Sequence, residues 1–444
     1  MSVIDLGLVT DERDSPAEPA RRPLRPGDLR WMLAAVVAAL CVLGLTGSAR
    51  PDSHAPRQLW AVAFQSEGDS FAATSDLVYV LSGAKRKLTA YGARDGAVRW
   101  TDSTLGDTAW MPPVEAGVML LPASVQEIAT EEGHGLQPVL RESVALDAVT
   151  GRELWRHPGD ATVAGDGRAL LVEWNDDASR IQTLHMVGLR DGKPLWSRPG
   201  GGAESWTVGT PAGFAADRLA TVGARGQIKV LDAATGRVVA TAVVPWVSQS
   251  AQGESYSTIS VEGRTLYVAS VDQGEGTLAA YDTETMRRKW HIGERAPAGV
   301  YRCGSVLCVG GSDGLAGVDP QSGALRWRAT GSPGGVPLRG GALLVTGDES
   351  GSRHFVIDTA SGQRVGDLGT GTLVFNYSYR QEALYLLTPT SQPPGQVAVR
   401  KVEDTGRAVL RGVMAPPSDH NCQNAGKLIA CVTTDGRLTV TDVG

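Results

Sequence analysis

One phrase recurs along this chain every 37 to 55 residues, and this repetition limits the possible folds more than any other feature of the sequence. The phrase is an apolar strand that ends in Asp, a short turn with Gly, three further residues and Trp. Its fullest copy is VALDAVTGRELW at residues 144–155. Such a period predicts one sheet-sized unit per copy, stacked on its neighbours. Counted by the turn position, the copies lie at Gly96, Gly151, Gly192, Gly236, Met286, Gly323, Gly362 and Gly406.

A second apolar stretch precedes each copy, with Val, Leu, Ile and Tyr at alternating positions, as in DLVYVLS at 76–82 and RTLYVAS at 264–270. This alternation, bounded by Gly, Asp and Ser, is typical of short antiparallel strands. Each unit supplies about four strands, and a sheet of that size cannot bury both faces alone, so the units are expected to stack around an axis. The sequence therefore predicts an all-β fold, a β-propeller of four-stranded blades, over residues 57–444.

The repeated residues have structural roles in this prediction. The Asp carboxylate accepts hydrogen bonds from backbone N–H groups of the turn, Gly supplies a positive φ, and Trp lies flat between neighbouring sheets. The residues with these roles are Trp60, Trp100, Asp147, Gly151, Trp155, Trp196, Asp232, Gly236, Asp282, Trp290, Asp319, Gly323, Trp327, Asp358 and Gly362.

The two ends of the predicted sheet domain complete each other. The segment GKLIACVTTDGRLTVTDVG at 426–444 contains two middle strands and the turn at Asp442, but it stops before the strand that carries Trp. The missing strand is present in RQLWAVAF at 57–64, with Trp60. Pairing of this first strand with the last unit would close the ring and remove the open sheet edges, which favours a closed propeller over an open solenoid.

The repeat resembles that of the pyrroloquinoline-quinone-type (PQQ-like) β-propellers. Their pattern A-x-D-x-x-T-G-x-x-x-W is matched by Ala145, Asp147, Thr150, Gly151 and Trp155, and the resemblance covers the whole predicted propeller. The chain looks like the branch that contains the propeller scaffold of the outer-membrane β-barrel assembly machine and membrane-anchored extracellular proteins of actinobacteria. Propellers of this family usually have eight blades, so the resemblance implies eight, whereas the nine hairpins counted in the sequence leave nine open.

The same repeat builds quinone-dependent alcohol dehydrogenases, so a PQQ-dependent oxidoreductase is an alternative function. Those enzymes have longer chains, an adjacent Cys-Cys disulfide over the cofactor, and a calcium or lanthanide site made by Glu, Asn and Asp. This sequence has no Cys-Cys dipeptide, no phosphate-binding loop and no zinc-binding His pair. No catalytic residue is carried over from the resemblance. We expect no enzymatic activity, no cofactor, and no catalytic, cofactor-binding or metal-binding residues.

An uncharged segment, WMLAAVVAALCVLGLTGSA at residues 31–49, is long enough to cross a bilayer core. Five arginines precede it between residues 13 and 30, whereas only Arg50 and Arg57 follow closely. Because positive charges stay on the cytoplasmic side, the remainder of the chain is expected outside the membrane.

This segment defines the predicted organisation of the amino-terminal region. We expect a single-pass membrane protein with its amino terminus in the cytoplasm and its propeller outside. A cleaved signal peptide is the alternative, since Gly47, Ser48 and Ala49 offer small residues for cleavage. The predicted parts are a disordered tail at 1–30, a transmembrane signal-anchor helix at 31–49, a linker at 50–56 and the propeller at 57–444.

Four of the five cysteines form two local pairs, Cys303 with Cys308 and Cys422 with Cys431. Each pair brackets a turn that contains Gly, which places the sulfur atoms on neighbouring strands, where disulfide Cα separations of about 4.4 to 6.8 Å are available. Two disulfides fit a location outside the cytoplasm. A four-Cys metal site is the alternative, but the eight residues between Cys422 and Cys431 exceed the usual ligand spacing.

Charge and composition exclude two classes of function. The chain has 42 Lys and Arg against 48 Asp and Glu, a net charge of -6, and 42% apolar residues. A basic nucleic-acid binder and a disordered chain are therefore both excluded. We expect a non-enzymatic binding or scaffold module for a protein or cell-envelope partner. An extracytoplasmic ligand sensor coupled to a cytoplasmic partner is a further alternative.

Partner binding on a rigid scaffold is expected at its long loops. The longest insertion is PASVQEIATEEGHGLQPVLRES at 122–143, followed by PWVSQSAQGESYS at 245–257 and TPTSQPPGQ at 388–396. Insertions that are merely tolerated at the surface are the alternative interpretation. The side chains expected to contact a partner are Glu127, Glu131, Glu132, Trp246 and Tyr256.

Overall fold

The computed structural model describes most of residues 55–444. The chain divides into a unit Met1–Ser53 and a unit His54–Gly444, and all described residues belong to the second unit. The predicted tail and membrane helix, residues 1–49, therefore lie outside the described residues. Within the part of the chain that is described, no helix is long and apolar enough to span a bilayer. The described residues are 55–65, 68–103, 111–112, 114–129, 136–209, 217–248, 255–293, 297, 299–331, 334–347, 352–374, 376, 383–392 and 394–444.

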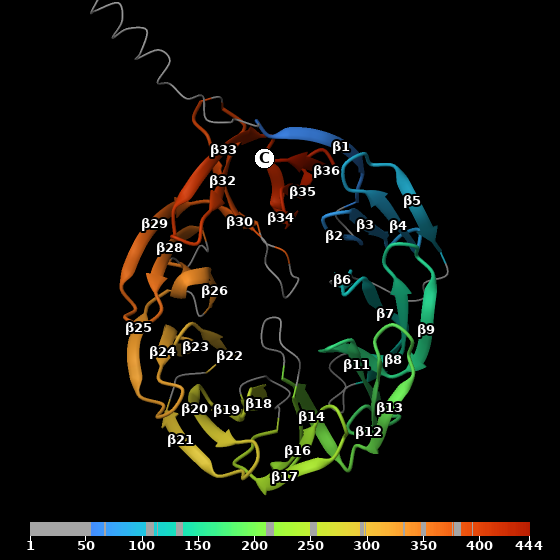
Figure 1. The fold of residues 1–444 in the computed structure, drawn as a ribbon, viewed down its shortest axis with the longest axis vertical. Helices are drawn as coiled ribbons and strands as arrows, with labels where there is room; N and C mark the ends of the chain where they lie inside the picture. Colours follow the sequence, from blue (N-terminus) through green and yellow to red (C-terminus); the bar gives the residue numbers. More distant parts are fainter. Residues whose placement is uncertain are drawn as a thin grey trace, which may run out of the picture. The chain divides into compact units, whose positions relative to one another are not determined.

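The second unit consists of nine four-stranded antiparallel sheets that follow one another around a ring (Figure 1). We number them blades 1 to 9 in chain order; the first strand of each blade lies innermost and the fourth lies on the rim. Blade 1 contains β2 (Asp69–Ala73), β3 (Leu77–Ser82), β4 (Lys87–Gly92) and β5 (Val98–Asp102). Blade 2 contains β6 (Val114–Glu115), β7 (Val118–Ala129), β8 (Leu136–Asp147) and β9 (Glu153–Pro158). Blade 3 contains β10 (Asp160–Gly165), β11 (Arg168–Trp174), β12 (Ile181–Gly188) and β13 (Pro194–Pro199).

The next three blades continue the same order of strands. Blade 4 contains β14 (Ala203–Val208), β15 (Arg218–Gly223), β16 (Gln227–Asp232) and β17 (Val238–Val243). Blade 5 contains β18 (Ser255–Glu262), β19 (Thr265–Asp272), β20 (Glu275–Asp282) and β21 (Arg288–Gly293). Blade 6 contains β22 (Gly299–Cys303), β23 (Val306–Gly311), β24 (Gly314–Val318) and β25 (Leu325–Ala329).

The last three blades complete the ring. Blade 7 contains β26 (Gly335–Pro337), the short 3-10 helix η1 (Arg339–Gly341), β27 (Ala342–Thr346), β28 (Arg353–Asp358) and β29 (Arg364–Thr370). Blade 8 contains β30 (Thr372–Val374), β31 (Leu384–Pro389), β32 (Val397–Val402) and β33 (Ala408–Met414). Blade 9 contains β34 (Pro417–Ala425), β35 (Leu428–Thr433), β36 (Arg437–Asp442) and, from the other end of the chain, β1 (Arg57–Ala63).

Strand β1 closes the ring. It pairs antiparallel with β36, from Arg57 opposite Asp442 to Ala63 opposite Arg437, and forms the rim strand of blade 9 (Figure 1). The predicted closed propeller is therefore confirmed. Its blades number nine, as the hairpin count allowed, rather than the eight that are usual in the family.

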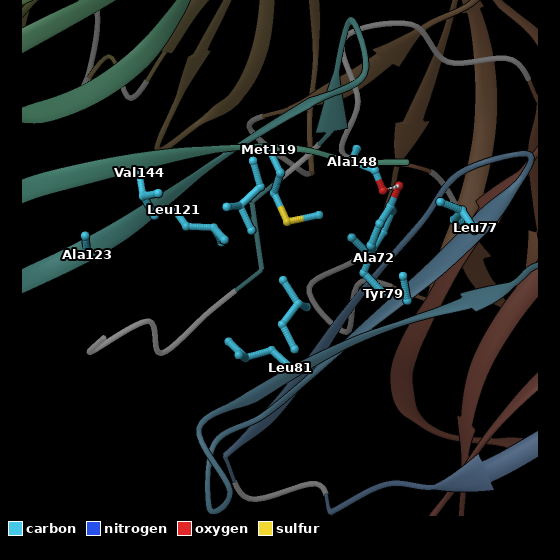
Figure 2. Packing of buried hydrophobic residues seen from close by; sticks show 12 residues of the cluster. Ala72, Leu77, Tyr79, Leu81, Met119, Leu121, Ala123, Val144 and Ala148 are labelled. Atoms are coloured by element: carbon cyan, nitrogen blue, oxygen red, sulfur yellow. Dashed lines mark hydrogen bonds between the residues drawn. The ribbon is translucent and has the colours of Figure 1, made fainter. Parts of the chain in front are cut away.

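The middle strands are buried on both faces, because each blade packs between two others. All six residues of β23 and all six of β35 are buried. Between blades 1 and 2, side chains such as Leu81 and Met119 fill the space (Figure 2). In the same contact, the Tyr79 hydroxyl donates a hydrogen bond to the Ala148 carbonyl at 3.1 Å. The core is thus a series of layers between blades rather than one central cluster.

A tryptophan on the rim strand joins six blades to the next one. In each case the indole Nε1 donates to a backbone carbonyl in the turn between the third and fourth strands of the next blade, at 2.7 to 3.2 Å. The indole is therefore fixed by a hydrogen bond as well as by packing. The donor and acceptor pairs are Trp60 with Ala93, Trp100 with Ala148, Trp155 with Leu189, Trp196 with Ala233, Trp290 with Pro320, and Trp327 with Thr359.

The turn glycines make room for these indoles. A Cβ atom at Gly323 would lie 2.7 Å from Cδ2 of Trp290, and one at Gly151 would lie 2.5 Å from Cδ2 of Trp100. Both glycines also have a φ of +71°. Gly is required at these two turns for the backbone conformation and for the close approach of the neighbouring blade.

The Asp carboxylates hold the same turns from within. In five turns, Oδ1 of Asp accepts hydrogen bonds from the backbone N–H and the side-chain hydroxyl of the Ser or Thr three residues later. At Asp358, the hydrogen bonds from Ser361 hold the pKa of the carboxyl below its usual value. The five aspartates are Asp147, Asp232, Asp282, Asp319 and Asp358.

At the contact between blades 4 and 5, other residues stand at both the tryptophan position and the glycine position of the repeat. Ala240 occupies the Trp position of β17, and Met286 occupies the Gly position of the turn in blade 5. Met286 keeps the turn, with a φ of 53° and its N–H bonded to the Asp282 carbonyl at 2.8 Å. Its buried side chain belongs to the cluster against which Ala240 packs. The methionine therefore fills space that an indole occupies at the six contacts with a rim tryptophan.

This exchange predicts a compensating double variant. Met286→Gly should lower the free energy of unfolding by about 1 to 2 kcal/mol, because the loss of a buried side chain is partly offset by relief of the positive φ. Ala240→Trp alone should cost about 1 to 3 kcal/mol by overpacking. The two changes together should recover most of the loss, as measured by urea unfolding of both single variants and the double variant. Simply additive losses would contradict this account of Met286.

Two disulfides link neighbouring strands, as predicted. Cys303 of β22 joins Cys308 of β23 with a Cα separation of 5.8 Å. Cys422 of β34 and Cys431 of β35 lie opposite each other in register, with a Cα separation of 4.2 Å. All four cysteines are buried. Because the thiols are joined in pairs, none of the four is left to bind a metal.

Candidate functional site

The two faces of the ring carry different connections. Because neighbouring strands in a blade are antiparallel, one face carries the connections from first to second and from third to fourth strands. We call this the turn face, since it holds the Asp turns. The other face, which we call the loop face, carries the connections from second to third strands and from each blade to the next. The three candidate loops at 122–143, 245–257 and 388–396 all belong to the loop face.

Strands β7 and β8 extend beyond their sheet on the loop face. Each has 12 residues, and they pair from Val118 opposite Asp147 to Ala129 opposite Leu136. The innermost strand β6 pairs only with the first two residues of β7, and the rim strand β9 pairs only with residues 142–146 of β8. Residues 125–129 and 136–141 therefore form a two-stranded ribbon without a third strand, which we call the ribbon.

Arg141 fixes the base of the ribbon to blade 3. Its Nη1 donates to the carbonyls of Trp174 and Asn175 at 2.9 and 2.8 Å, and its Nη2 donates to that of Asp176 at 2.7 Å. Its Nε donates to Oε1 of Gln126 on the opposite strand of the ribbon at 2.8 Å. A two-stranded hairpin is only marginally stable in water by itself. This set of charge-assisted hydrogen bonds therefore holds the ribbon in place.

The insertion expected as a loop at 122–143 is thus mostly strand, with its two halves paired across the ribbon. Glu127 lies on β7 opposite Pro138, and its side chain is exposed. Val139 on β8 is only 6% exposed, so part of the ribbon is packed rather than surrounded by water. Glu131 and Glu132 fall outside the described residues.

The second candidate loop is anchored to blades 4 and 5. Trp246 is half-buried and packs against the cluster between these blades. The N–H of Val247 donates to the Ser257 hydroxyl at 2.8 Å. Tyr256 is half-buried in β18, the innermost strand of blade 5, opposite Val271. Trp246 and Tyr256 therefore lie at the two ends of the connection between blades 4 and 5. This connection is on the same face of the ring as Glu127, which belongs to blade 2.

The third candidate loop is a short turn between β31 and β32 of blade 8. The backbone N–H and the hydroxyl of Thr390 donate to the Gln396 carbonyl at 3.0 and 3.1 Å. These hydrogen bonds join the two ends of the loop.

One half-buried carboxyl lies on an innermost strand. Asp160 begins β10 and pairs with Val172, a buried residue of the cluster between blades 3 and 4. Across the described ranges, no hydrogen bond or ion pair reaches the Asp160 carboxylate. Burial alone raises the pKa of this carboxyl to about 6. Strongly shifted carboxyls of this kind are common at functional sites, so Asp160 is a candidate site residue.

Three polar side chains form a row across blade 3. Nδ1 of His185 on β12 lies 2.7 Å from the hydroxyl of Ser197 on β13. Nε2 of His185 lies 3.4 Å from Oε1 of Glu173 on β11. A hydroxyl, an imidazole and a carboxylate can relay a proton when hydrogen bonds join all three. Among the described residues, Nε2 of His185 has no hydrogen-bond partner, and Ser197 is exposed on a rim strand where water has free access, so the row is best described as a surface polar cluster.

Sequence reasoning did not identify Asp160, the contacts of Arg141 or the row on blade 3. The row could have been found from the sequence, because the repeat pairs the strand of Trp196 with the strand of Met186 and so places Ser197 opposite His185. Burial of Asp160 has no such signal, since it depends on how one blade packs against the next.

Across the described residues, no group of three or more His, Cys, Asp or Glu side chains is arranged to hold a metal ion.

Comparisons with known proteins agree with the repeat. The sequence model of the family described as "Outer membrane protein assembly factor BamB" matches residues 52–199 and 180–335, more than half of the chain. A comparison with curated proteins gives no significant match.

Among solved structures, the chain is similar to BamB from Moraxella catarrhalis, with 15% identity and a TM-score of 0.39 over 87% of this chain and 99% of that one. It is also similar to the quinohemoprotein alcohol dehydrogenase ADHIIG from Pseudomonas putida HK5, with 14% identity and a TM-score of 0.39 over 64% of this chain and 61% of that one. A eukaryotic initiation factor aligns with a TM-score of 0.51 and 9% identity over 80% of this chain and 92% of that one, which shows a shared fold only. By the family match, the chain belongs to the PQQ-like propeller family of the outer membrane protein assembly factor BamB.

Proposed function

We propose that this protein is a membrane-anchored, extracytoplasmic scaffold whose loop face binds a protein or cell-envelope partner. The observation that carries the proposal is the ribbon, a partly exposed two-stranded extension held to the neighbouring blade by Arg141. A rigid scaffold that presents an ordered extension can bind a partner without the entropy cost of ordering a loop.

Two further observations support this function. The family to which the chain belongs includes a protein named as an assembly factor, which is a scaffolding role. Both disulfides are buried within the propeller, and disulfides persist in oxidising compartments outside the cytoplasm. The apolar segment 31–49 supplies the anchor in this proposal.

The partner and the location can be tested together in intact cells. Glu127→Cys should react with a membrane-impermeant thiol-reactive crosslinker added to the cells, and it should capture a partner. Val149→Cys is the matched control, because Val149 is 67% exposed in a turn of the same blade but on the turn face. It should be labelled without capturing that partner. Failure to label either cysteine would contradict the extracytoplasmic location, and equal capture at both would contradict the loop face as the binding surface.

Arg141→Ala should reduce capture from Glu127→Cys. The variant loses four hydrogen bonds from a charged donor, two of them part-buried and two exposed, so the ribbon should open locally. Hydrogen exchange should then rise in residues 136–141 and 174–176 while the other blades stay protected. Arg225→Ala, at an exposed turn of blade 4 on the same face, is the control and should change neither exchange nor capture. Unchanged exchange in Arg141→Ala would overturn the assigned role of this arginine.

A further inference from the structure

Strand β17 on the rim of blade 4 is unlike the other rim strands. Its sequence is VVATAV, with no charged residue. In the described part of the chain, each of the other eight rim strands contains at least one Arg, Lys, Asp or Glu. Charged side chains on an edge strand prevent pairing with a strand of another molecule. The protection that the other blades have is therefore missing at β17.

The exposed surface of β17 is apolar. Val243 is 73% exposed and Val238 is 45% exposed. Thr241, between them, is also exposed. An edge strand with exposed valines and no charge has the properties of a strand that pairs in the assembled protein.

The free edge of β17 also presents unpaired backbone groups. The N–H of Val244 donates to the Gly226 carbonyl at 3.0 Å, and β17 pairs with β16 in regular register from Ala240 to Val243. Antiparallel alternation then turns the N–H and C=O groups of Ala240 and Ala242 toward β16 and those of Thr241 and Val243 outward. These outward groups can form a further ladder of hydrogen bonds.

The sequence around Thr241 indicates which strand fits this edge. Residues 238–244 read VVATAVV, the same in both directions. In an antiparallel pair of two such strands centred on Thr241, threonine faces threonine, alanine faces alanine and valine faces valine. Cross-strand pairs of matched β-branched side chains stabilise a sheet, and like charges placed opposite each other destabilise it.

Charge distinguishes β17 from β25, another rim strand, when each strand is paired antiparallel with its copy in a second molecule. Self-pairing of β25 about Trp327 would place Arg326 opposite Arg328 of the second copy. Along the chain, the charge nearest to β17 is Arg237, which would lie at opposite ends of the two paired strands. Lys229 lies opposite Thr241 on β16, one strand away from the proposed contact. Self-association is thus electrostatically unfavourable at β25 and free of that penalty at β17.

We propose that two copies of this protein associate through β17, by antiparallel pairing about a twofold axis at Thr241. The contact joins two blades into one eight-stranded sheet and buries Val243 of each copy against Val239 of the other. The interface is isologous, so it closes as a dimer and does not extend into a filament. The ladder is short, and we expect a dissociation constant on the order of micromolar.

The full-length protein in detergent provides the first test. Its mass by light scattering should change from monomer to dimer as its concentration rises from about 1 to 200 micromolar. Thr241→Lys places two positive charges face to face at the axis and should give a monomer throughout this range. Val149→Lys, at an exposed valine of another blade, should dimerise like the wild type. A wild-type protein that stays monomeric, or a Thr241→Lys variant that still dimerises, would overturn the proposal.

Crosslinking tests the identity of the paired strand. In a Cys41→Ala background, Thr241→Cys treated with a short thiol crosslinker should give a covalent dimer of the chain. Val149→Cys in the same background should stay monomeric. Capture of a different protein by Thr241→Cys in membranes, with no covalent dimer of this chain, would show that β17 accepts a partner's strand and would contradict self-association.

Discussion

Replacing Trp327 with alanine should lower the free energy of unfolding by about 3 to 5 kcal/mol, the range for loss of a large buried aromatic side chain. Trp327 is buried between blades 6 and 7, in a cluster with Leu315 and Leu343. Its Nε1 donates to the Thr359 carbonyl at 2.7 Å, and its ring lies over Gly362. The variant therefore loses packing on both blades and leaves a buried carbonyl without its donor.

The loss should be concentrated at one blade contact. Because each blade touches mainly its neighbours, hydrogen exchange should rise first in blades 6 and 7. Urea unfolding followed by far-ultraviolet circular dichroism measures the overall change without relying on the fluorescence of the deleted indole. Leu325→Ala is the matched control on the same strand, since Leu325 is 57% exposed, and it should cost less than about 0.5 kcal/mol. Equal losses in the two variants would contradict a special role for the indole.

The fold class, the closure of the ring and the two disulfides could be predicted from the sequence because each depends on local pattern. One hairpin is described completely by a strand that ends in Asp, a turn with Gly and a later Trp. Trp60 and the turn at Asp442 in the same way mark the two halves of one blade. The cysteines lie close in sequence on adjacent strands, so their pairing follows from the hairpins.

Features that depend on contacts between blades could not be predicted in the same way. The segment 122–143 has Pro, Gly and several charges, which indicate a loop, yet most of it lies in the paired strands β7 and β8. Arg141 holds the ribbon part of these strands to carbonyls of blade 3. The number of blades followed from counting hairpins and not from family precedent. At Met286, a departure from the repeat is explained only by Ala240, 46 positions earlier in the sequence and on the facing blade.

Asp160 is the second residue for which we expect a large effect, and the expected effect is a gain in stability, which is unusual for a change in a half-buried residue. Burial raises the pKa of its carboxyl to about 6, from 3.8. The folded protein therefore holds this proton more tightly than the unfolded chain, so the free energy of unfolding falls as the pH rises from about 4 to 6. Above that range, the ionised carboxylate costs about 2 to 3 kcal/mol.

Asp160→Asn removes this cost, because the amide has the same shape as the carboxyl and carries no charge. The variant should be more stable than the wild type by about 2 to 3 kcal/mol at pH 7, with the two proteins equal near pH 3, as measured by urea unfolding across this range. Asp358→Asn is the control of opposite sign, since hydrogen bonds hold the pKa of Asp358 low and its charge stabilises the folded state at pH 7.

A protein retains a destabilising carboxylate when another molecule uses it, so loss of function in the more stable Asp160→Asn protein would identify Asp160 as part of the site. Equal stability of wild type and Asp160→Asn at pH 7 would show that the carboxylate is compensated in the folded protein and would remove this reason to assign it a function.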